Sequence, residues 1–244
     1  MRHTRLHCET TLREDASLHL DRDAAHYLGN VLRMRQGQCV HVFNANDGEF
    51  VACIEQLAKK YAELRVGKLL RAPAAPRLEI ELCLGLSRGD RMSTAIQKST
   101  ELGVSRITPF FSARGEAKLS RERSGNRLEH WRRIAISAVE QSGGFRVPDF
   151  SEPLPLERVL QAPAEADCTR LLFDPAGSAR LPDSLPGDRL QIVTGPEGGF
   201  AEPELKLAAR CGYAVIALGP RILRTETAPL AILAILQHRY GDMG

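Results

Sequence analysis

Strand and helix patterns alternate after residue 77, and this alternation constrains the fold of the chain more than any other feature. Leu78-Glu-Ile-Glu-Leu-Cys-Leu84 has apolar residues at every second position, which predicts a strand. Residues 90–102 carry apolar side chains at three- and four-residue spacing, which predicts a helix. The pattern continues with a strand at 106–111, a helix at 127–142, strands at 169–174 and 189–194, a helix at 203–211 and a strand at 213–218. Such alternation predicts an α/β fold with a mostly parallel sheet covered by helices.

Residues 1–70 follow a different pattern. Cys39-Val-His-Val-Phe43 and Phe50-Val-Ala-Cys-Ile54 flank the turn sequence Asn44-Ala-Asn-Asp-Gly48, which is typical of a β-hairpin. With a strand at 61–66 and one short helix within 23–33, this region predicts a small β-rich unit. Both prolines of Ala72-Pro-Ala-Ala-Pro76 interrupt regular structure, because proline has no backbone N–H and a fixed φ. We place a domain boundary there and expect domains at 1–72 and 73–244.

Composition indicates an ordinary soluble globular protein and excludes little else. The formal net charge of +3 is too small to identify a nucleic-acid partner. None of the six cysteines forms a Cys-x-x-Cys pair, so we expect no metal site and reduced thiols, as in a cytosol. The N-terminus is charged where a signal peptide is apolar, and no apolar run is long enough to span a bilayer. We therefore expect a cytoplasmic protein without a membrane segment.

Two polar loops that contain glycine follow two of the predicted strands near the C-terminus. They are Thr194-Gly-Pro-Glu-Gly-Gly-Phe200 and Leu218-Gly-Pro-Arg-Ile-Leu-Arg-Thr-Glu-Thr-Ala-Pro229. Ligands of open α/β sheets lie beyond the carboxyl ends of strands, and glycine lets backbone approach a ligand closely. The Gly-x-x-x-x-Gly-Lys and Gly-x-Gly-x-x-Gly signatures are both missing, and the loops come too late in the chain for a Rossmann-type site. The two loops therefore predict an active site that is neither a phosphate loop nor a Rossmann-type dinucleotide site.

The second loop places charge between a buried strand and an apolar helix. Arg221, Arg224, Thr225, Glu226 and Thr227 are costly there unless they have partners. One explanation is a ligand site. The other is purely structural, with Arg224 paired to Glu226 and Thr227 capping the helix.

Four motifs in order resemble the small-subunit ribosomal RNA methyltransferase E family, which methylates uridine N3 in 16S rRNA. They are Gln97-Lys-Ser-Thr-Glu-Leu-Gly103, Glu140-Gln-Ser142, Gly195-Pro-Glu-Gly-Gly199 and Leu218–Ala228, and His26-Tyr-Leu-Gly-Asn-Val-Leu-Arg-Met-Arg35 resembles the family's N-terminal segment. The resemblance implies a SPOUT catalytic domain, an α/β fold whose C-terminal part forms a trefoil knot and binds S-adenosylmethionine. It also implies a small N-terminal PUA-like β-barrel domain that holds RNA, and a homodimer. The apolar helix at 228–236 is either part of the dimer interface or part of the core of its own chain.

The resemblance also implies roles for individual residues. Arg224 is the expected catalytic cation, which stabilises the anion that forms on the uracil ring. Glu226 is the expected base, with Glu197 and bulk water as alternatives. Residues expected to bind the cofactor are Leu172, Phe173, Thr194, Gly195, Glu197, Gly198, Gly199, Leu218, Gly219, Leu223, Arg224, Thr225, Thr227 and Ala228.

The expected partner is 16S rRNA or the small ribosomal subunit, with the protein acting in ribosome biogenesis. Residues expected to contact RNA phosphates are Arg2, Arg5, Arg33, Arg35, Lys98, Arg114, Lys118 and Arg146. The chain has Gly144 where the family often has arginine, and Arg146 is a substitute for its reach. Three other functions stay open at this point: a SPOUT methyltransferase acting on another base or on a ribose 2′-hydroxyl, a non-catalytic RNA-binding protein, and a nucleotide-binding metabolic enzyme.

Overall fold

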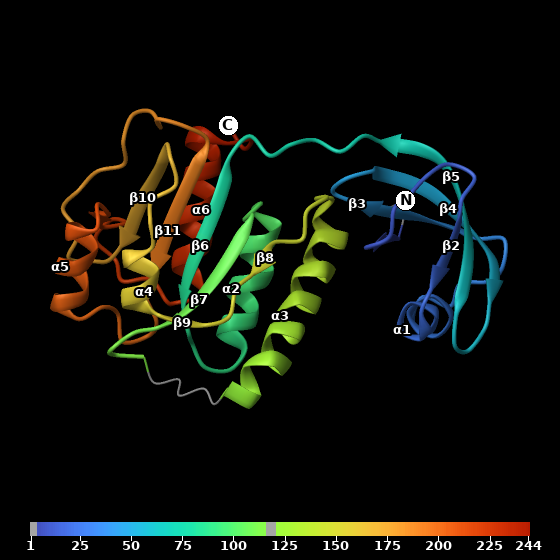
Figure 1. Cartoon of the computed structure of the whole chain (residues 1–244), viewed down its shortest axis with the longest axis horizontal. Coiled ribbons are helices and arrows are strands. Elements are labelled where there is room, and N and C mark those ends of the chain that lie inside the picture. Colours follow the sequence, from blue (N-terminus) through green and yellow to red (C-terminus); the bar gives the residue numbers. More distant parts are fainter. Residues whose placement is uncertain (1–3, 116–120) are drawn as a thin grey trace. The chain divides into compact units, whose positions relative to one another are not determined.

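The chain folds into two compact units (Figure 1). The computed structural model describes residues 4–115 and 121–244. The first unit combines Met1–Ala75 with Val139–Arg146, and the second combines Pro76–Ala138 with Val147–Gly244. The second segment of the first unit includes the C-terminal end of a long helix. The helix itself was predicted, but nothing in the local sequence pattern predicts that its end belongs to the first unit.

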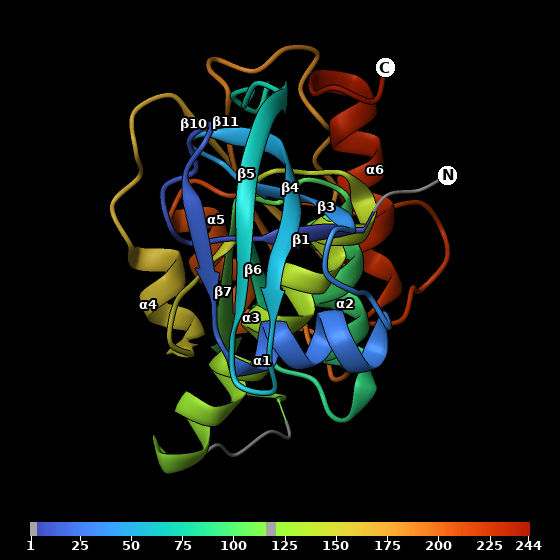
Figure 2. The same ribbon diagram turned by 90° about the vertical axis from the view of Figure 1, so that its right-hand side faces the viewer.

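A five-stranded sheet with the order β1-β3-β4-β5-β2 forms the first unit (Figure 2). Only β1 and β3 pair in parallel, and the other neighbours are antiparallel. Its core contains Leu28, Val40, Val42, Ile54 and Leu64. The strands are β1 (Arg5–His7), β2 (Ser17–Leu20), β3 (Cys39–Asn44), β4 (Gly48–Leu57) and β5 (Ala62–Arg71), and the helices are α1 (Arg22–His26) and the π-helix η1 (Tyr27–Val31).

The predicted hairpin is confirmed as β3 and β4, joined at Asn44–Gly48. The expectation of six reduced thiols is wrong for one pair, because Cys39 and Cys53 form a disulfide. The two cysteines are directly opposite each other on β3 and β4, with their Cα atoms 4.0 Å apart. The hairpin brings together residues whose sequence separation of 14 carries no pairing signal. The other four cysteines are free.

A seven-stranded sheet forms the centre of the second unit, with the order β12-β10-β11-β6-β7-β8 and with β9 also on β7. Every neighbouring pair in it is parallel, which confirms the predicted α/β architecture. The strands are β6 (Glu79–Gly85), β7 (Arg106–Phe111), β8 (Asp149–Phe150), β9 (Leu154–Pro155), β10 (Cys168–Phe173), β11 (Arg189–Thr194) and β12 (Ala214–Ile216).

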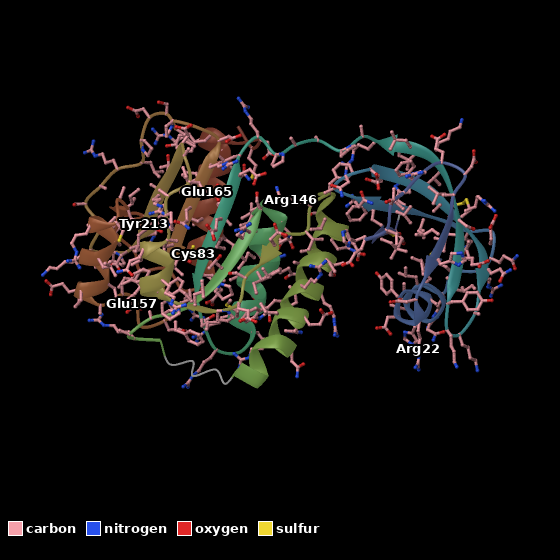
Figure 3. The ribbon with its side chains drawn as sticks, viewed as in Figure 1. Arg22, Cys83, Arg146, Glu157, Glu165 and Tyr213 are labelled. Carbon is pink, nitrogen blue, oxygen red and sulfur yellow. A yellow bond between two sulfur atoms is a disulfide. The ribbon has the colours of Figure 1, made fainter. Side chains whose placement is uncertain are left out.

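Helices cover both faces of this sheet. One apolar cluster joins the sheet to residues of α2, α3 and α6, including Ile96, Trp131 and Leu233. A second cluster joins the other face to α4 and α5, and there Cys83 of β6 and Tyr213, just before β12, lie among the sheet side chains (Figure 3). The helices are α2 (Asp90–Glu101), α3 (Arg121–Ser142), α4 (Leu156–Gln161), α5 (Glu202–Arg210) and α6 (Thr227–Tyr240).

Several elements differ from the sequence prediction. The strand expected at 213–218 is only Ala214–Ile216, because the chain turns at residues 219–221 toward the second loop. The short elements β8, β9 and α4 were not expected from the pattern.

In the part of the chain that the structure describes, no helix combines the length and apolar character needed to cross a bilayer. Within that same part, no group of three or more His, Cys, Asp or Glu residues is arranged to hold a metal ion.

Candidate functional site

A cavity of about 450 Å³ lies beyond the carboxyl ends of β10, β11 and β12 in the second unit. Its walls come from the end of β10, the loop after β11, the loop after β12, the start of α6 and one residue of α2. The lining residues are Arg91, Phe173, Asp174, Pro175, Gly195, Pro196, Glu197, Gly199, Phe200, Leu218, Gly219, Arg221, Ile222, Leu223, Arg224, Thr225, Glu226, Ala228 and Ile232.

Glycine is required where backbone segments meet around this cavity. Gly85 ends β6, and a Cβ added there would lie 2.4 Å from the backbone nitrogen of Pro196, so no larger residue fits without moving the loop. Gly199 lines the cavity with φ +65°, in the left-handed region that side chains disfavour. The loop after β11 therefore packs directly on the end of β6.

A buried carboxylate fixes the far end of the same loop. Glu204 is 5% exposed, and its two oxygens accept the backbone N–H groups of Ala201, at 2.7 Å, and of Ala113, at 2.8 Å. Ala113 follows β7 and Ala201 precedes α5. Glu204 thus ties the loop after β11 to the loop after β7.

One ion-pair cluster connects three segments of the cavity wall. The Arg91 Nη1 atom lies 2.9 Å from Glu197 Oε1, and its Nε atom lies 4.0 Å from Glu226 Oε2. The backbone N–H of Arg88 also donates to Glu197 Oε1, at 3.3 Å. Burial alone would raise the pKa of Glu197, but hydrogen bonds from its own backbone N–H, from Arg91 and from Arg88, with the charge of Arg91, hold that pKa below its usual value.

Arg224 is in a different environment. Within the described part of the chain, its guanidinium makes no ion pair or side-chain hydrogen bond, while its carbonyl oxygen accepts the N–H groups of Thr227 and Ala228, each at 2.9 Å. Glu226 is the N-cap residue of α6 and makes no side-chain capping bond there. The purely structural explanation, with Arg224 paired to Glu226 and Thr227 as the cap, is therefore wrong. Arg224 is a cavity cation without an intramolecular counter-charge among the described residues.

The structure brings most of the predicted cofactor residues together. Glu226, the predicted base, also lines the cavity. Four predicted residues do not line it: Leu172 and Thr194 are buried in the sheet, and Gly198 and Thr227 are exposed outside the cavity. The predicted cofactor residues that line the cavity are Phe173, Gly195, Glu197, Gly199, Leu218, Gly219, Leu223, Arg224, Thr225 and Ala228.

Sequence reasoning missed Arg91 and Asp174. Asp174 directly follows β10, so the rule that ligands lie beyond strand ends was sufficient to find it. Arg91 lies in the first turn of α2, after β6. Its role depends on β6 being next to β11 in the sheet, and no local signal predicts that neighbour.

Among the predicted RNA contacts, Arg2 and Lys118 lie outside the described residues. Lys98 pairs with Glu101 on the surface of α2, at 2.7 Å. Arg146 is exposed after the C-terminal end of α3 (Figure 3). The other exposed ones are Arg33, Arg35 and Arg114.

Arg5 is mostly buried instead, with 10% of its side chain exposed. Its guanidinium donates to Glu49 and to the carbonyl oxygens of Val139 and Gly144, both at 2.8 Å. Glu49 also accepts from His41, at 2.8 Å, and lies 3.1 Å from Arg71. These bonds occupy Arg5 inside the first unit, so its predicted phosphate contact gives way to a structural one.

Comparison with known proteins places these features in a family. Residues 74–237 match the model of an RNA methyltransferase domain, and residues 20–67 match that of an RNA methyltransferase PUA domain. The chain is 30% identical to the ribosomal RNA small subunit methyltransferase E of Buchnera aphidicola subsp. Acyrthosiphon pisum over 239 residues, covering 98% of this chain and 94% of that one.

Solved structures agree over nearly the whole chain. The ribosomal RNA small subunit methyltransferase E from Neisseria gonorrhoeae, bound to S-adenosyl methionine, is 33% identical with a TM-score of 0.89, covering 99% of this chain and 100% of that one. A Legionella pneumophila protein in complex with its cofactor SAM is 34% identical with a TM-score of 0.92, again covering 99% and 100%.

Proposed function

This chain belongs to the ribosomal RNA small subunit methyltransferase E family, and we propose that it transfers the methyl group of S-adenosylmethionine to N3 of a uridine in 16S rRNA. The observation that carries the proposal is the cavity formed by the two glycine-containing loops. Relatives that match nearly all of this chain are solved with the cofactor bound. The match to this family argues against a nucleotide-binding metabolic enzyme.

The residues of the cavity fit this cofactor. A volume of about 450 Å³ is in the range of small-molecule sites. Phe173, Leu218 and Ile232 offer apolar surface for a purine ring, while Gly199 and Gly219, both with positive φ, expose backbone groups without a Cβ. S-adenosylmethionine supplies an electrophilic methyl group when it is bound.

In the proposed mechanism, Arg224 stabilises the uracil anion. Loss of the N3 proton spreads negative charge onto O2 and O4 of the ring, and a positioned cation in a cavity lowers the energy of that charge. Arg224 suits this role because the described residues give its guanidinium no carboxylate partner. The loops on either side of the cavity would hold the cofactor, and methyl transfer would require the uracil nitrogen to be placed close to its methyl group.

Glu226 is our choice for the proton acceptor. Of the two carboxylates near Arg91, Glu197 is the poorer base, because its pKa is lowered and Arg91 lies 2.9 Å away. Glu226 is 4.0 Å from the same arginine. Its side chain is 21% exposed, so water can carry the proton away.

RNA binding is proposed for both units. We propose that the domain at 1–72 holds rRNA through Arg33 and Arg35, and that the domain at 73–244 contributes Lys98, Arg114 and Arg146. Exposure of the four arginines supports the proposal, whereas Lys98 is half-buried and pairs with Glu101. The partner is 16S rRNA or the small ribosomal subunit, and the cytoplasm is the expected location because ribosomes are assembled there.

We further propose a homodimer and a knotted C-terminal segment, as the family resemblance implies. The apolar character of α6 supports the dimer, because Ile235 is 38% exposed on a helix that buries Ile232, Leu233 and Leu236. Arrangement of the loops after β11 and β12 around one cavity supports the knot, although β10 separates their strands in the sheet.

A labelling experiment tests the reaction. Purified protein is incubated with methyl-labelled S-adenosylmethionine and with either naked 16S rRNA or small subunits from cells that lack the modification, and the labelled nucleoside is identified. Label in 3-methyluridine supports the proposal, and the better substrate gives the assembly stage. Label on another base or on a ribose 2′-hydroxyl would refute N3 as the target. Cofactor binding without any label would favour the non-catalytic RNA-binding protein.

A further inference from the structure

We propose that Arg91 is a positioning residue that holds the two cavity loops together and so sets the affinity for the cofactor. The inference rests on the proposed function for the identity of the cofactor. It assigns a role to a residue that the motifs of the two loops do not contain.

The backbone of Arg91 is fixed by its helix. Arg91 lies in the first turn of α2, and the next residue, Met92, is 3% exposed in the core with Ala95 and Ile96 behind it. The Arg91 side chain is 49% exposed and points away from that core to the cavity. A rigid anchor with a long side chain is suited to bridging two loops.

The two loops belong to separate parts of the sheet. Glu197 belongs to the loop after β11, and Glu226 belongs to the loop after β12. Strand β10 lies between β11 and β12, so the two loops follow strands that are not neighbours in the sheet. Arg91 comes from a third element, after β6, and reaches both carboxylates.

Charge balance favours this role over RNA binding. Without Arg91, two carboxylates would face the same opening and repel each other. When Glu197 and Glu226 both face Arg91, their negative charge offsets its positive charge and weakens its attraction for an RNA phosphate. Arg221 and Arg224 differ in this respect, because in the described part of the chain neither forms an ion pair.

Binding of the cofactor in the absence of RNA tests the role of Arg91. We would measure the Kd for S-adenosylmethionine and S-adenosylhomocysteine by calorimetry for the wild type, Arg91→Gln, Arg91→Lys, Glu197→Gln and the Arg91→Gln/Glu197→Gln double variant. Arg91→Gln should raise Kd on the order of tenfold, equivalent to about 1.4 kcal/mol. Arg91→Lys should restore most of the loss, and the double variant should lose less than the sum of its parts.

Two further measurements separate positioning from other roles. Arg91→Gln should raise KM for the cofactor and leave kcat at saturating cofactor within about twofold, since uniform binding is what it removes. Its melting temperature should match that of Arg210→Gln, a control at an exposed arginine in the last turn of α5.

Three results would overturn the inference. They are an unchanged cofactor Kd in Arg91→Gln, full additivity in the double variant, and a rise in KM for RNA alone. Failure of the proposed function has a separate signature. A wild type that binds the cofactor but methylates no RNA refutes the function, while the Kd series still decides the role of Arg91. A wild type that binds no cofactor refutes both.

Discussion

At the scale of single residues, two arginines of one cavity have opposite surroundings. Arg91 faces two carboxylates, whereas Arg224 has no ion-pair partner among the described residues. Both side chains carry the same guanidinium group, so their surroundings determine their proposed roles. Arg91 is engaged by carboxylates of the protein, whereas Arg224 is available to a substrate. The sequence motif identified Arg224, but the role of Arg91 follows from the position of its neighbours.

Arg224→Ala should abolish turnover and keep the fold. Loss of a cation that stabilises a developing anion costs about 10²–10³ in kcat. The guanidinium is exposed and holds no intramolecular ion pair in the described chain, so the melting temperature should change little. Steady-state kinetics and thermal unfolding, both compared with Arg224→Lys, check this. Retention of full activity in the alanine variant would remove Arg224 from the mechanism.

Gly85→Ala should weaken both the fold and cofactor binding. The added methyl group would lie 2.4 Å from the Pro196 backbone nitrogen, so the loop after β11 must shift, at a cost of about 1–3 kcal/mol. Gly125→Ala is the matched control, because a Cβ at Gly125 in α3 has no atom within 4 Å. Urea unfolding and cofactor titration measure both effects. Equal behaviour of the two variants would show that the loop does not depend on this contact.

At the scale of elements, the first unit depends on a charged cluster around Glu49. That carboxylate is only 9% exposed and contacts Arg5, His41 and Arg71. Arg71 also donates to the carbonyl oxygen of Gly143, at 2.5 Å, and its guanidinium lies 4.1 Å from the centre of the Phe145 ring. The cluster therefore attaches the segment after α3 to the sheet of the first unit.

Glu49→Gln should destabilise the first unit by about 3 kcal/mol, because it leaves the buried Arg5 guanidinium without its counter-charge. Burial would raise the pKa of Glu49, but hydrogen bonds from His41 and Arg5, with the charges of Arg5 and Arg71, outweigh it and lower the pKa. Because the pKa of Glu49 is lower in the folded state than in the unfolded state, the ionised carboxylate stabilises the fold. This stabilisation is complete above the unfolded-state pKa of about 4.3 and is lost as pH falls through the folded-state pKa.

The difference between wild type and Glu49→Gln should thus be constant near neutral pH and shrink in acid. Urea unfolding at a series of pH values measures it. Glu55→Gln is the control, since Glu55 is 42% exposed in a surface pair with Arg65 and should cost less than about 1 kcal/mol. A difference that grows in acid would contradict the assigned direction.

Sequence pattern predicted elements well and their neighbours poorly. The strands at 106–111 and 189–194 and the helix from residue 90 have the predicted positions, because local apolar periodicity determines them. No local sequence pattern predicts that Val139–Arg146 belongs to the first unit. This grouping depends on hydrogen bonds from Arg5 and Arg71, which are far away in the sequence. The cavity loops were predicted, but the residue that bridges them was not.

At the scale of the whole molecule, the surface of α6 bears on the number of chains in the assembly. Residues 228–236 of the helix are all apolar, and Ile235 is 38% exposed. Such a helix is stable in water only when it is covered, either by its own chain or by another.

We expect a mass in solution of twice 26.9 kDa. Ile235→Glu should shift the protein toward the monomer, because it puts a charge into the proposed apolar contact. Light scattering after size exclusion gives the mass. Val31→Glu, at a residue that is 59% exposed in the first unit, should leave it unchanged. A monomeric wild type would refute the dimer.

The strand order of the second unit also has a consequence for synthesis. Strand β6 lies between β7 and β11, and β11 emerges long after its neighbour. The last residue that lines the cavity, Ile232, is close to the C-terminus. Because a chain emerges from its N-terminus, the first unit is complete once Arg146 has been made, but the cavity cannot form until Ile232 of α6 has been made. An enzyme proposed to modify ribosomes would then acquire its cofactor site only after the ribosome that makes it has added α6.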